Sequence, residues 1–233
     1  MTLAGAKMRT RLLEADPDLA RNLPPESVSA ITPHLVAEVL ELPAGDWSPD
    51  RAEPHPGHLG YLVLDGLILR RTELNGAHSG ELISRGDLIR PWIEEPISFS
   101  TFEWKVMNPV RLAVLDRRVG ARLCTQPELS AALLDRLTLR TRSLAIHAAT
   151  ENVRGLEDRV LTLFWHLAER WGSREHDGVV VPIHLTHETL ALLIGARRPS
   201  VTTALGALAK RGALRRRDDG DWVLYGMPPA GGD

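Results

Sequence analysis

Cysteine is nearly absent from this 233-residue chain, which contains only Cys124. One thiol cannot form an intramolecular disulfide, and it cannot supply the ligands of a zinc ribbon or of a cysteine-held iron–sulfur cluster. Long apolar runs are missing as well. None approaches the roughly 18 residues of a membrane span, and the opening MTLAGAKMRTRLLEADPD lacks the apolar stretch of a signal peptide. We therefore expect a cytoplasmic protein with no membrane association.

Charge is distributed unevenly along the chain. The formal net charge is −2, yet residues 181–225 hold seven Lys/Arg against four Asp/Glu, so this segment carries +3 and the remainder −5. The hydrophobic content of 43% and charged content of 25% are those of an ordinary soluble protein with one large or two smaller domains. A basic segment on an acidic body indicates a polyanionic partner, and a merely solvated face is the alternative.

Residues 36–116 have the composition of an antiparallel sandwich or barrel. Short branched-aliphatic runs alternate with Gly, Pro, Asn and Asp, namely VAEVLEL, LGYLVLDGLILRRTEL, HSGELIS and VRLAVLD. The dipeptides Asp-Gly at 65–66 and Asn-Gly at 75–76 each predict a tight hairpin turn. Upstream, four prolines divide a helical pattern that begins at residue 9, which predicts several short helices.

Residues 127–150 predict one long helix, because they contain no glycine and no internal proline. Its apolar residues recur roughly on one stripe, formed by Leu129, Leu133, Leu137, Leu144 and Ala148. Such a stripe packs either against its own chain or against a second copy as a coiled-coil seam. The heptad register slips between residues 140 and 141, so the sequence leaves both alternatives open. A further amphipathic helix is predicted over 155–172.

The C-terminal segment predicts two helices followed by a hairpin. Thr186 is a suitable N-cap for a first helix that ends at Gly195. The second helix should start with Pro199, preceded by Arg198 as its cap. Its apolar stripe is Val201, Ala204, Leu205 and Leu208. The helix should end at Gly212, and ALRRR and DWVLY then predict two strands joined by DDG. Together these elements form a winged helix-turn-helix.

Two arginines, Arg197 and Arg198, precede the second helix, although a helix N-terminus favours anions. Their position is understandable if a phosphate or a guanine edge is supplied from outside. Small residues at 200, 202 and 203 would let such a helix enter a DNA major groove. A helical hairpin that only packs is the alternative, but it does not explain why cap, turn, stripe and basic hairpin coincide.

The segment LTHETLALLIGARRPSVTTALGALAKRGALRR resembles the winged helix-turn-helix of the Crp/Fnr (catabolite activator-like) regulators. Upstream, GHLGYLVLDGLILR and ELISRGDLI resemble that family's jelly-roll sensor domain, which is cyclic-nucleotide-binding-like. The resemblance implies an α+β fold with an antiparallel β jelly roll, a long dimerisation helix and a winged helix-turn-helix. The corresponding domains are residues 1–121, 122–150 and 151–233.

The resemblance also implies the function. The protein is expected to be a homodimeric transcription regulator that reads a palindromic operator in double-stranded DNA and has no catalytic activity. RNA polymerase and an unidentified small-molecule effector are further candidate partners. No cofactor or metal is expected.

Several DNA-contacting residues carry over from the family. Arg198 matches the arginine that reads a guanine through O6 and N7, and phosphate-contacting positions are matched by Arg197, Ser200 and His187. Thr202 and Thr203 lie on the same helix, and the wing residues Arg215 and Arg216 are expected to contact phosphates.

Two positions depart from the family. Pro199 stands where several relatives carry an acidic residue, and Thr203 where they carry a second base-reading arginine. The DNA sequence of the operator half-site therefore cannot be inferred from that of the relatives.

The effector pocket is less well matched. In the family's cyclic-nucleotide binders, Gly-Glu-Leu is followed about ten residues later by Arg-Ser or Arg-Thr, whereas this chain has Gly86, Asp87 and Leu88 with no such pair at that distance. Arg90 is a nearby cation, but Pro91 and two acids, at 94 and 95, crowd the place of an anion. A buried phosphate without a paired cation is costly, so we do not expect cyclic AMP or cyclic GMP to bind.

Aromatic residues follow the same segment. The side chains of Trp92, Phe99, Phe102 and Trp104 either line an apolar pocket or fill the core, and core filling is favoured.

The alternative function is a cupin-like metalloenzyme, or a small-molecule binder, with a helical appendage. His55 and His58 invite a metal site, but the His-x-His and glutamate pattern of cupins is missing. No histidine spacing argues for haem, and no nucleophile motif is present.

Overall fold

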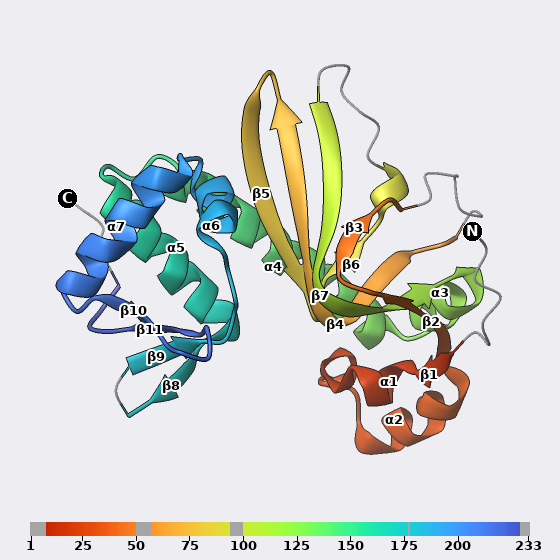
Figure 1. Cartoon of the computed structure of the whole chain (residues 1–233). Helices are drawn as coiled ribbons and strands as arrows, with labels where there is room; N and C mark the ends of the chain where they lie inside the picture. The colour runs from red at the N-terminus through yellow and green to blue at the C-terminus, as the bar shows by residue number, and fades with distance from the viewer. Residues whose placement is uncertain (1–7, 50–56, 94–99, 177, 229–233) are drawn as a thin grey trace. The chain divides into compact units, whose positions relative to one another are not determined.

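The computed structural model describes residues 8–49, 57–93, 100–176 and 178–228. They form two compact units, an N-terminal and a C-terminal one, which comprise residues 1–77 with 81–141 and residues 78–80 with 142–233. The first is built mainly on an antiparallel sheet, and the second combines helices with a smaller sheet (Figure 1). The predicted α+β class is confirmed. The functional boundaries after residues 121 and 150 stay predictions.

The sheet of the N-terminal unit has the strand order β1-β2-β7-β4-β5, with β3 paired to β7 and β6 to β4, and it does not close in the described residues. Its strands are β1 (Arg9–Arg11), β2 (Val36–Leu42), β3 (Gly45–Trp47), β4 (Gly60–Leu74), β5 (Ala77–Ser84), β6 (Leu88–Ile89) and β7 (Ser100–Leu115). Short helical segments adjoin it, namely α1 (Leu12–Ala15), η1 (Pro17–Ala20), α2 (Pro25–Ile31), η2 (Thr32–His34), η3 (Pro91–Ile93) and α3 (Arg117–Cys124). The proline-divided short helices are confirmed, whereas β1 was not predicted.

The two predicted hairpins have opposite outcomes. Asn75 and Gly76 both have positive φ, 51° and 77°, and they join β4 to β5 as a tight turn requires. The prediction at residues 65–66 is wrong, because β4 continues through them with register shifts against β7. At Gly66 an added Cβ would collide with the carbonyl oxygen of Pro109 and with Val110. The glycine therefore permits close approach of a neighbouring strand at an irregular point of the ladder.

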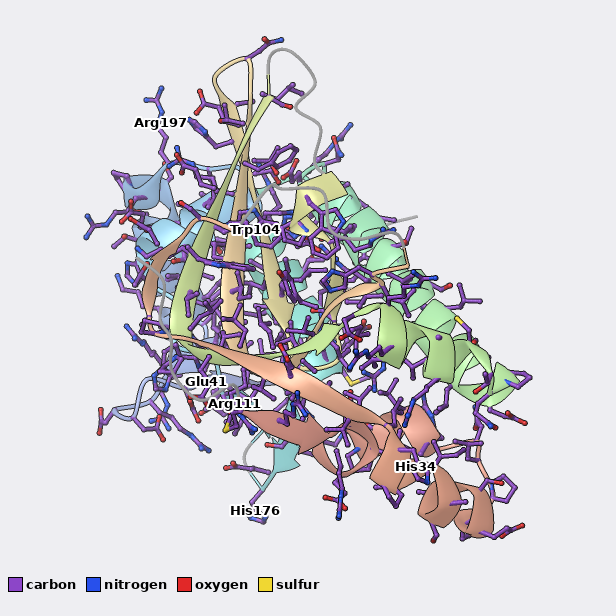
Figure 2. The ribbon with its side chains drawn as sticks, turned by 90° about the vertical axis from the view of Figure 1, so that its right-hand side faces the viewer. His34, Glu41, Trp104, Arg111, His176 and Arg197 are labelled. Atoms are coloured by element: carbon purple, nitrogen blue, oxygen red, sulfur yellow. The ribbon has the colours of Figure 1, made fainter. Side chains whose placement is uncertain are left out.

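Strand β7 extends the core of the N-terminal unit beyond the predicted residues 110–116. It begins at Ser100 and carries Trp104 into a buried cluster with Val63, Ile68 and Leu112. Trp104 lies against the strands of the sheet (Figure 2). This confirms core filling for Trp104, while Phe99 lies outside the described residues.

The long helix α4 (Pro127–Thr150) has the predicted bounds, but the single apolar stripe is wrong. Leu129 and Leu133 are buried in the core of the N-terminal unit, whereas Leu134, Leu137 and Leu144 are exposed. Residues spaced by four drift by about 40° around a straight helix, so the stripe divides into an inner and an outer face.

Beyond the end of α4, the described part of the C-terminal unit contains three further helices and a four-stranded antiparallel sheet of order β10-β11-β9-β8. Its elements are α5 (Leu156–Trp171), β8 (Ser173–Glu175), β9 (Gly178–Val181), α6 (His187–Ile194), α7 (Arg198–Lys210), β10 (Leu214–Arg216) and β11 (Trp222–Leu224). The ring centroids of Phe164 and Trp222 lie 4.8 Å apart, which packs α5 against the hairpin. Strands β8 and β9 were not predicted. Among the described residues, no helix has the length and apolarity needed to cross a bilayer.

Candidate functional site: an exposed basic helix and wing

The turn between α6 and α7 is built from local capping signals. The Thr186 hydroxyl accepts a hydrogen bond from the backbone N–H of Thr189 at 3.1 Å, which caps α6 as predicted. Gly195 ends α6 in the left-handed conformation with φ 64° and ψ 40°. The N–H of Ala196 then donates to the carbonyl of Ala191 at 2.9 Å. This closure leaves two residues before α7 begins.

The cap of α7 differs from the prediction by one residue. Arg197 is the N-cap, with the extended dihedrals φ −83° and ψ 139°, and Arg198 already belongs to the helix before Pro199. A following proline disfavours helical dihedrals but does not forbid them, so Arg198 is accommodated in the first turn. Arg198 is thus attached to a rigid element, while Arg197 extends before it.

The two faces of α7 have different characters. The predicted stripe is confirmed, since Val201, Ala204, Leu205 and Leu208 are all buried. The opposite face is exposed and consists of small or cationic residues, namely Arg198, Ser200, Thr202, Thr203, Gly206 and Lys210. A narrow, polar face with cations at both ends has the shape and charge that a DNA groove accepts.

The threonine hydroxyl groups on this face are already partnered. Thr202 Oγ1 donates to the carbonyl of Arg198 at 3.1 Å, and Thr203 Oγ1 donates to that of Pro199 at 3.2 Å. His187 Nδ1 lies 2.9 Å from Thr202 Oγ1. Because a hydroxyl has a single hydrogen, Thr202 makes both of its bonds only when His187 donates from Nδ1. The start of α6 is thereby tied to α7.

The hairpin β10–β11 is the predicted wing. Arg215 opposes Val223, and the turn closes with the N–H of Gly220 donating to the carbonyl of Arg217 at 3.1 Å. Arg216 Nε donates to the Gly220 carbonyl at 3.4 Å, and its guanidinium lies 5.6 Å from the ring centroid of Trp222. The wing is therefore ordered by its own contacts.

Arginines of this unit differ in their partners. Arg217 is paired with Glu175 at 2.5 Å, and the hydrogen bond that its guanidinium donates to this carboxylate raises the pKa of Arg217. In contrast, the side chains of Arg197, Arg198 and Arg215 make no hydrogen bond or ion pair within the described residues. Arg197 projects away from the ribbon (Figure 2). These three cations are available to an external anion.

The residues considered for an effector pocket separate into two groups. Gly86 and Asp87 form a turn in which the backbone N–H of Gly86 donates to the carbonyl of Val63. The Asp87 carboxylate accepts from the backbone N–H of Ser84 at 2.8 Å and is buried. The carboxylate thus closes its own turn, beside the buried Leu88.

Arg90 and Trp92 form the second group. The Arg90 guanidinium lies 5.9 Å from the Trp92 ring, which in turn contacts the rings of His58 and Tyr61 at 4.9 and 5.4 Å. Burial lowers the pKa of His58, and Arg90 adds to this effect while Asp116 opposes it. His55 and the acids at 94 and 95 lie outside the described residues.

An ion-pair network in the N-terminal unit was missed by the sequence analysis. Glu81 on β5 accepts two hydrogen bonds from Arg140 on α4, at 2.7 and 3.0 Å, and pairs with Arg70 on β4 at 2.7 Å. Even the two members that are closest in the sequence, Arg70 and Glu81, lie on different strands. The spacing of these residues in the sequence therefore does not predict the network. No group of three or more potential metal ligands occurs among the described residues.

The fold and the basic helix define a winged helix-turn-helix protein with a cyclic-nucleotide-binding-like domain. Residues 158–224 match the model of the Crp-like helix-turn-helix domain. The chain is 27% identical over 194 residues to the "CRP-like cAMP-activated global transcriptional regulator" of Mycobacterium tuberculosis (strain ATCC 25618 / H37Rv), with 82% of this chain and 85% of the relative covered. It is 28% identical over 189 residues to the "Transcriptional regulator SdrP" of Thermus thermophilus, with 77% and 86% covered. The Crp-like helix-turn-helix match and the two regulator relatives support a transcription regulator of the Crp/Fnr type.

Solved structures agree on the fold. A CooA mutant from Carboxydothermus hydrogenoformans aligns with a TM-score of 0.67 at 15% identity, covering 93% of this chain and 92% of that chain. A CRP/FNR family transcriptional regulator from Thermus thermophilus aligns with a TM-score of 0.57 at 22% identity, covering 81% and 94%. These likenesses confirm the predicted jelly-roll-like domain with a C-terminal helix-turn-helix.

Proposed function

We propose that the protein binds double-stranded DNA as a homodimer and reads a palindromic operator with α7 of each protomer. The observation that carries the proposal is the exposed, narrow face of α7, with Arg197 and Arg198 at its start and Arg215 on the wing, all without partners among the described residues. Arginine is the side chain best suited to a guanine edge or a phosphate. The protein has no catalytic role in this proposal.

Each residue of the interface has a proposed role. Arg198 reads a guanine, because the first turn of the helix holds it in one place. Arg197 precedes the helix and contacts a phosphate. The remaining phosphate contacts come from residues near the backbone of the duplex, namely Ser200, His187, Arg215 and Arg216. Thr202 and Thr203 are small, and their hydroxyl groups bond to the helix backbone, so they let α7 lie close to the floor of the DNA groove.

The outer face of α4 supports the dimer. Leu134, Leu137 and Leu144 are exposed, with Leu134 63% accessible, and they are spaced by three and seven residues. When Thr141 and Ala148 are included, successive residues of this face are alternately three and four positions apart. This alternation is the heptad pattern of a coiled-coil seam. A two-fold dimer would present its recognition helices to half-sites about one DNA turn apart.

The experiment that tests this function is selection of genomic fragments by the purified protein, followed by sequencing. We expect enrichment of an inverted repeat and tighter binding of that repeat than of a shuffled duplex by fluorescence anisotropy. Sedimentation should give a dimer. A monomer at micromolar concentration, with and without DNA, or fragments enriched without a common sequence, would contradict the proposal.

We also propose that cyclic AMP is not the effector, although the Mycobacterium tuberculosis relative is described as cAMP-activated. Two observations support this. The Asp87 carboxylate is engaged by the backbone of its own turn, and neither Arg-Ser nor Arg-Thr occurs in residues 88–116 of the sequence. Titration calorimetry should detect no binding; a dissociation constant below about 100 μM, or roughly −5.5 kcal/mol, would refute the proposal.

RNA polymerase remains a proposed partner of the DNA-bound dimer. A pull-down with operator DNA present and absent would test that contact. Recovery of polymerase in neither condition would remove it.

A further inference from the structure

One carboxylate lies between two arginines within the N-terminal unit. The Glu81 side chain is 12% exposed, and those of Arg70 and Arg140 are 21% and 15% exposed. Arg140 uses Nε and Nη2 as a fork on the two carboxylate oxygens, at 2.7 and 3.0 Å, and Arg70 adds a contact of 2.7 Å. Shielded from water, such contacts are stronger than surface ion pairs.

The two cations are held by groups other than Glu81. Arg140 Nη1 donates to the carbonyl of Leu88 at 2.9 Å. The Arg70 guanidinium lies 5.7 Å from the ring centroids of both Phe102 and Trp104. The positions of both guanidinium groups are therefore preorganised, as they would be in a site built for an anion.

We propose that Arg70 and Arg140 form an anion site of the sensor-like domain, and that the Glu81 carboxylate is its resident occupant. The chain itself supplies the anion that a small carboxylate or phosphate ligand would otherwise bring. When Glu81 occupies the anion site, its ion pairs connect β4 and β5 to α4, the helix that carries the proposed dimer seam. The consequence for DNA binding rests on the proposed function, whereas the anion site does not.

The first test is rescue by an added anion. Glu81→Ala leaves the two cations and a space of carboxylate size, so the melting temperature of the full chain should fall by about 5–15 °C. Sodium acetate or formate should restore at least half of the loss, while sodium chloride at the same ionic strength should restore less. Wild type should respond equally to these salts. The matched control is Glu103→Ala, which removes an exposed pair of the same sheet, 3.6 Å from Arg71.

A second pair of variants keeps the proposal testable if Glu81→Ala does not fold. Glu81→Asp retains the negative charge on a shorter side chain, whereas Glu81→Gln retains the shape and removes the charge. We expect the Asp variant to have the higher melting temperature. Equal or higher stability of the Gln variant, or a soluble Glu81→Ala protein that carboxylate anions do not rescue, would overturn the anion site.

Operator binding separates the site from the function built on it. Glu81→Ala should bind the selected operator at least tenfold more weakly, roughly 1.4 kcal/mol, and acetate should reverse this loss. Thermal rescue without any effect on DNA affinity would retain the anion site and refute its link to the dimer. Absence of DNA binding by wild type would refute the proposed function alone.

Discussion

Two partly buried arginines of the N-terminal unit and three exposed arginines of the C-terminal unit are used in opposite ways. In the N-terminal unit the partly buried Arg136 and Arg140, both on α4, pair with Asp16 and Glu81 respectively. In the C-terminal unit Arg197, Arg198 and Arg215 have exposed guanidinium groups without partners among the described residues. The comparison teaches that the availability of a cation, rather than the count of cations, marks the candidate DNA interface.

Solvation explains the difference. A guanidinium removed from water must find a carboxylate or carbonyl within the chain, because an unpaired buried charge is very unfavourable. An exposed guanidinium keeps its water until a partner displaces it. The exposed cations therefore contribute little to folding and can contribute fully to DNA binding.

The largest effect should come from breaking a buried pair. Arg136→Ala leaves the carboxylate of Asp16, only 1% exposed, without the guanidinium that pairs with it. The free energy of unfolding should fall by about 3–5 kcal/mol in urea denaturation. Arg198→Ala, the control from the other unit, should change it by less than about 0.5 kcal/mol. Similar losses in both variants would remove the contrast.

The next effect concerns the two faces of α4. The double variant Leu137→Asp/Leu144→Asp places charges on the exposed seam and should weaken the dimer by about 2–4 kcal/mol, or roughly 30- to 1,000-fold. Sedimentation over a range of concentrations measures this. Leu139→Asp is the matched control, since Leu139 is 58% exposed but lies off the heptad. If both proteins dissociate equally, the seam has been assigned to the wrong face.

Arg198→Ala should cost about 1–3 kcal/mol of operator affinity and relax base preference at one symmetric position. The reason is loss of a bidentate guanine contact from the first turn of α7. Anisotropy against the operator and its single-base variants measures both effects. An equal loss on operator and random DNA would show that Arg198 contacts phosphate.

Arg197→Ala and Arg215→Ala should weaken operator and random DNA alike. Each should reduce the slope of log affinity against log salt by about 0.9, as expected for one lost phosphate contact. Arg217→Ala provides the control, because this guanidinium is already bound by Glu175. A salt slope that changes as much in the Arg217 variant would show that internal pairing does not decide which arginines meet DNA.

The smallest effect is a pH dependence within the C-terminal unit. Burial lowers the pKa of His166 below 6.5, with the Glu169 carboxylate opposing the shift, and Ser143 Oγ lies 2.9 Å from its Nε2. The unfolded chain therefore binds this proton more tightly than the folded chain. The contribution of His166 to the free energy of unfolding is therefore complete above about pH 6.5. It is lost as the pH falls through the lowered pKa of the folded protein.

His166→Gln should make the melting temperature less sensitive to acid over this window. Part of the acid sensitivity of the melting temperature should remain in this variant, because burial also lowers the pKa of His58. Identical pH profiles for the variant and wild type would show that His166 contributes nothing to the decline.

Elements specified by neighbouring residues were predictable from the sequence. The Thr186 cap, the left-handed Gly195 and the Asn75–Gly76 turn depend on interactions within a few residues, and each was confirmed. The bounds of α4 and the buried stripe of α7 follow from helix propensity and periodicity. The family resemblance likewise rested on contiguous segments.

Only the tertiary structure decided the features that depend on distant partners. Gly66 looked like a turn residue until β7 was seen to approach it, and α4's leucines divide because one face meets the N-terminal core. Glu81 and Arg140, 59 residues apart, carry no mutual signal in the sequence. Charge in a sequence is a local property, whereas the desolvation and pairing of that charge depend on which strands and helices the fold brings together.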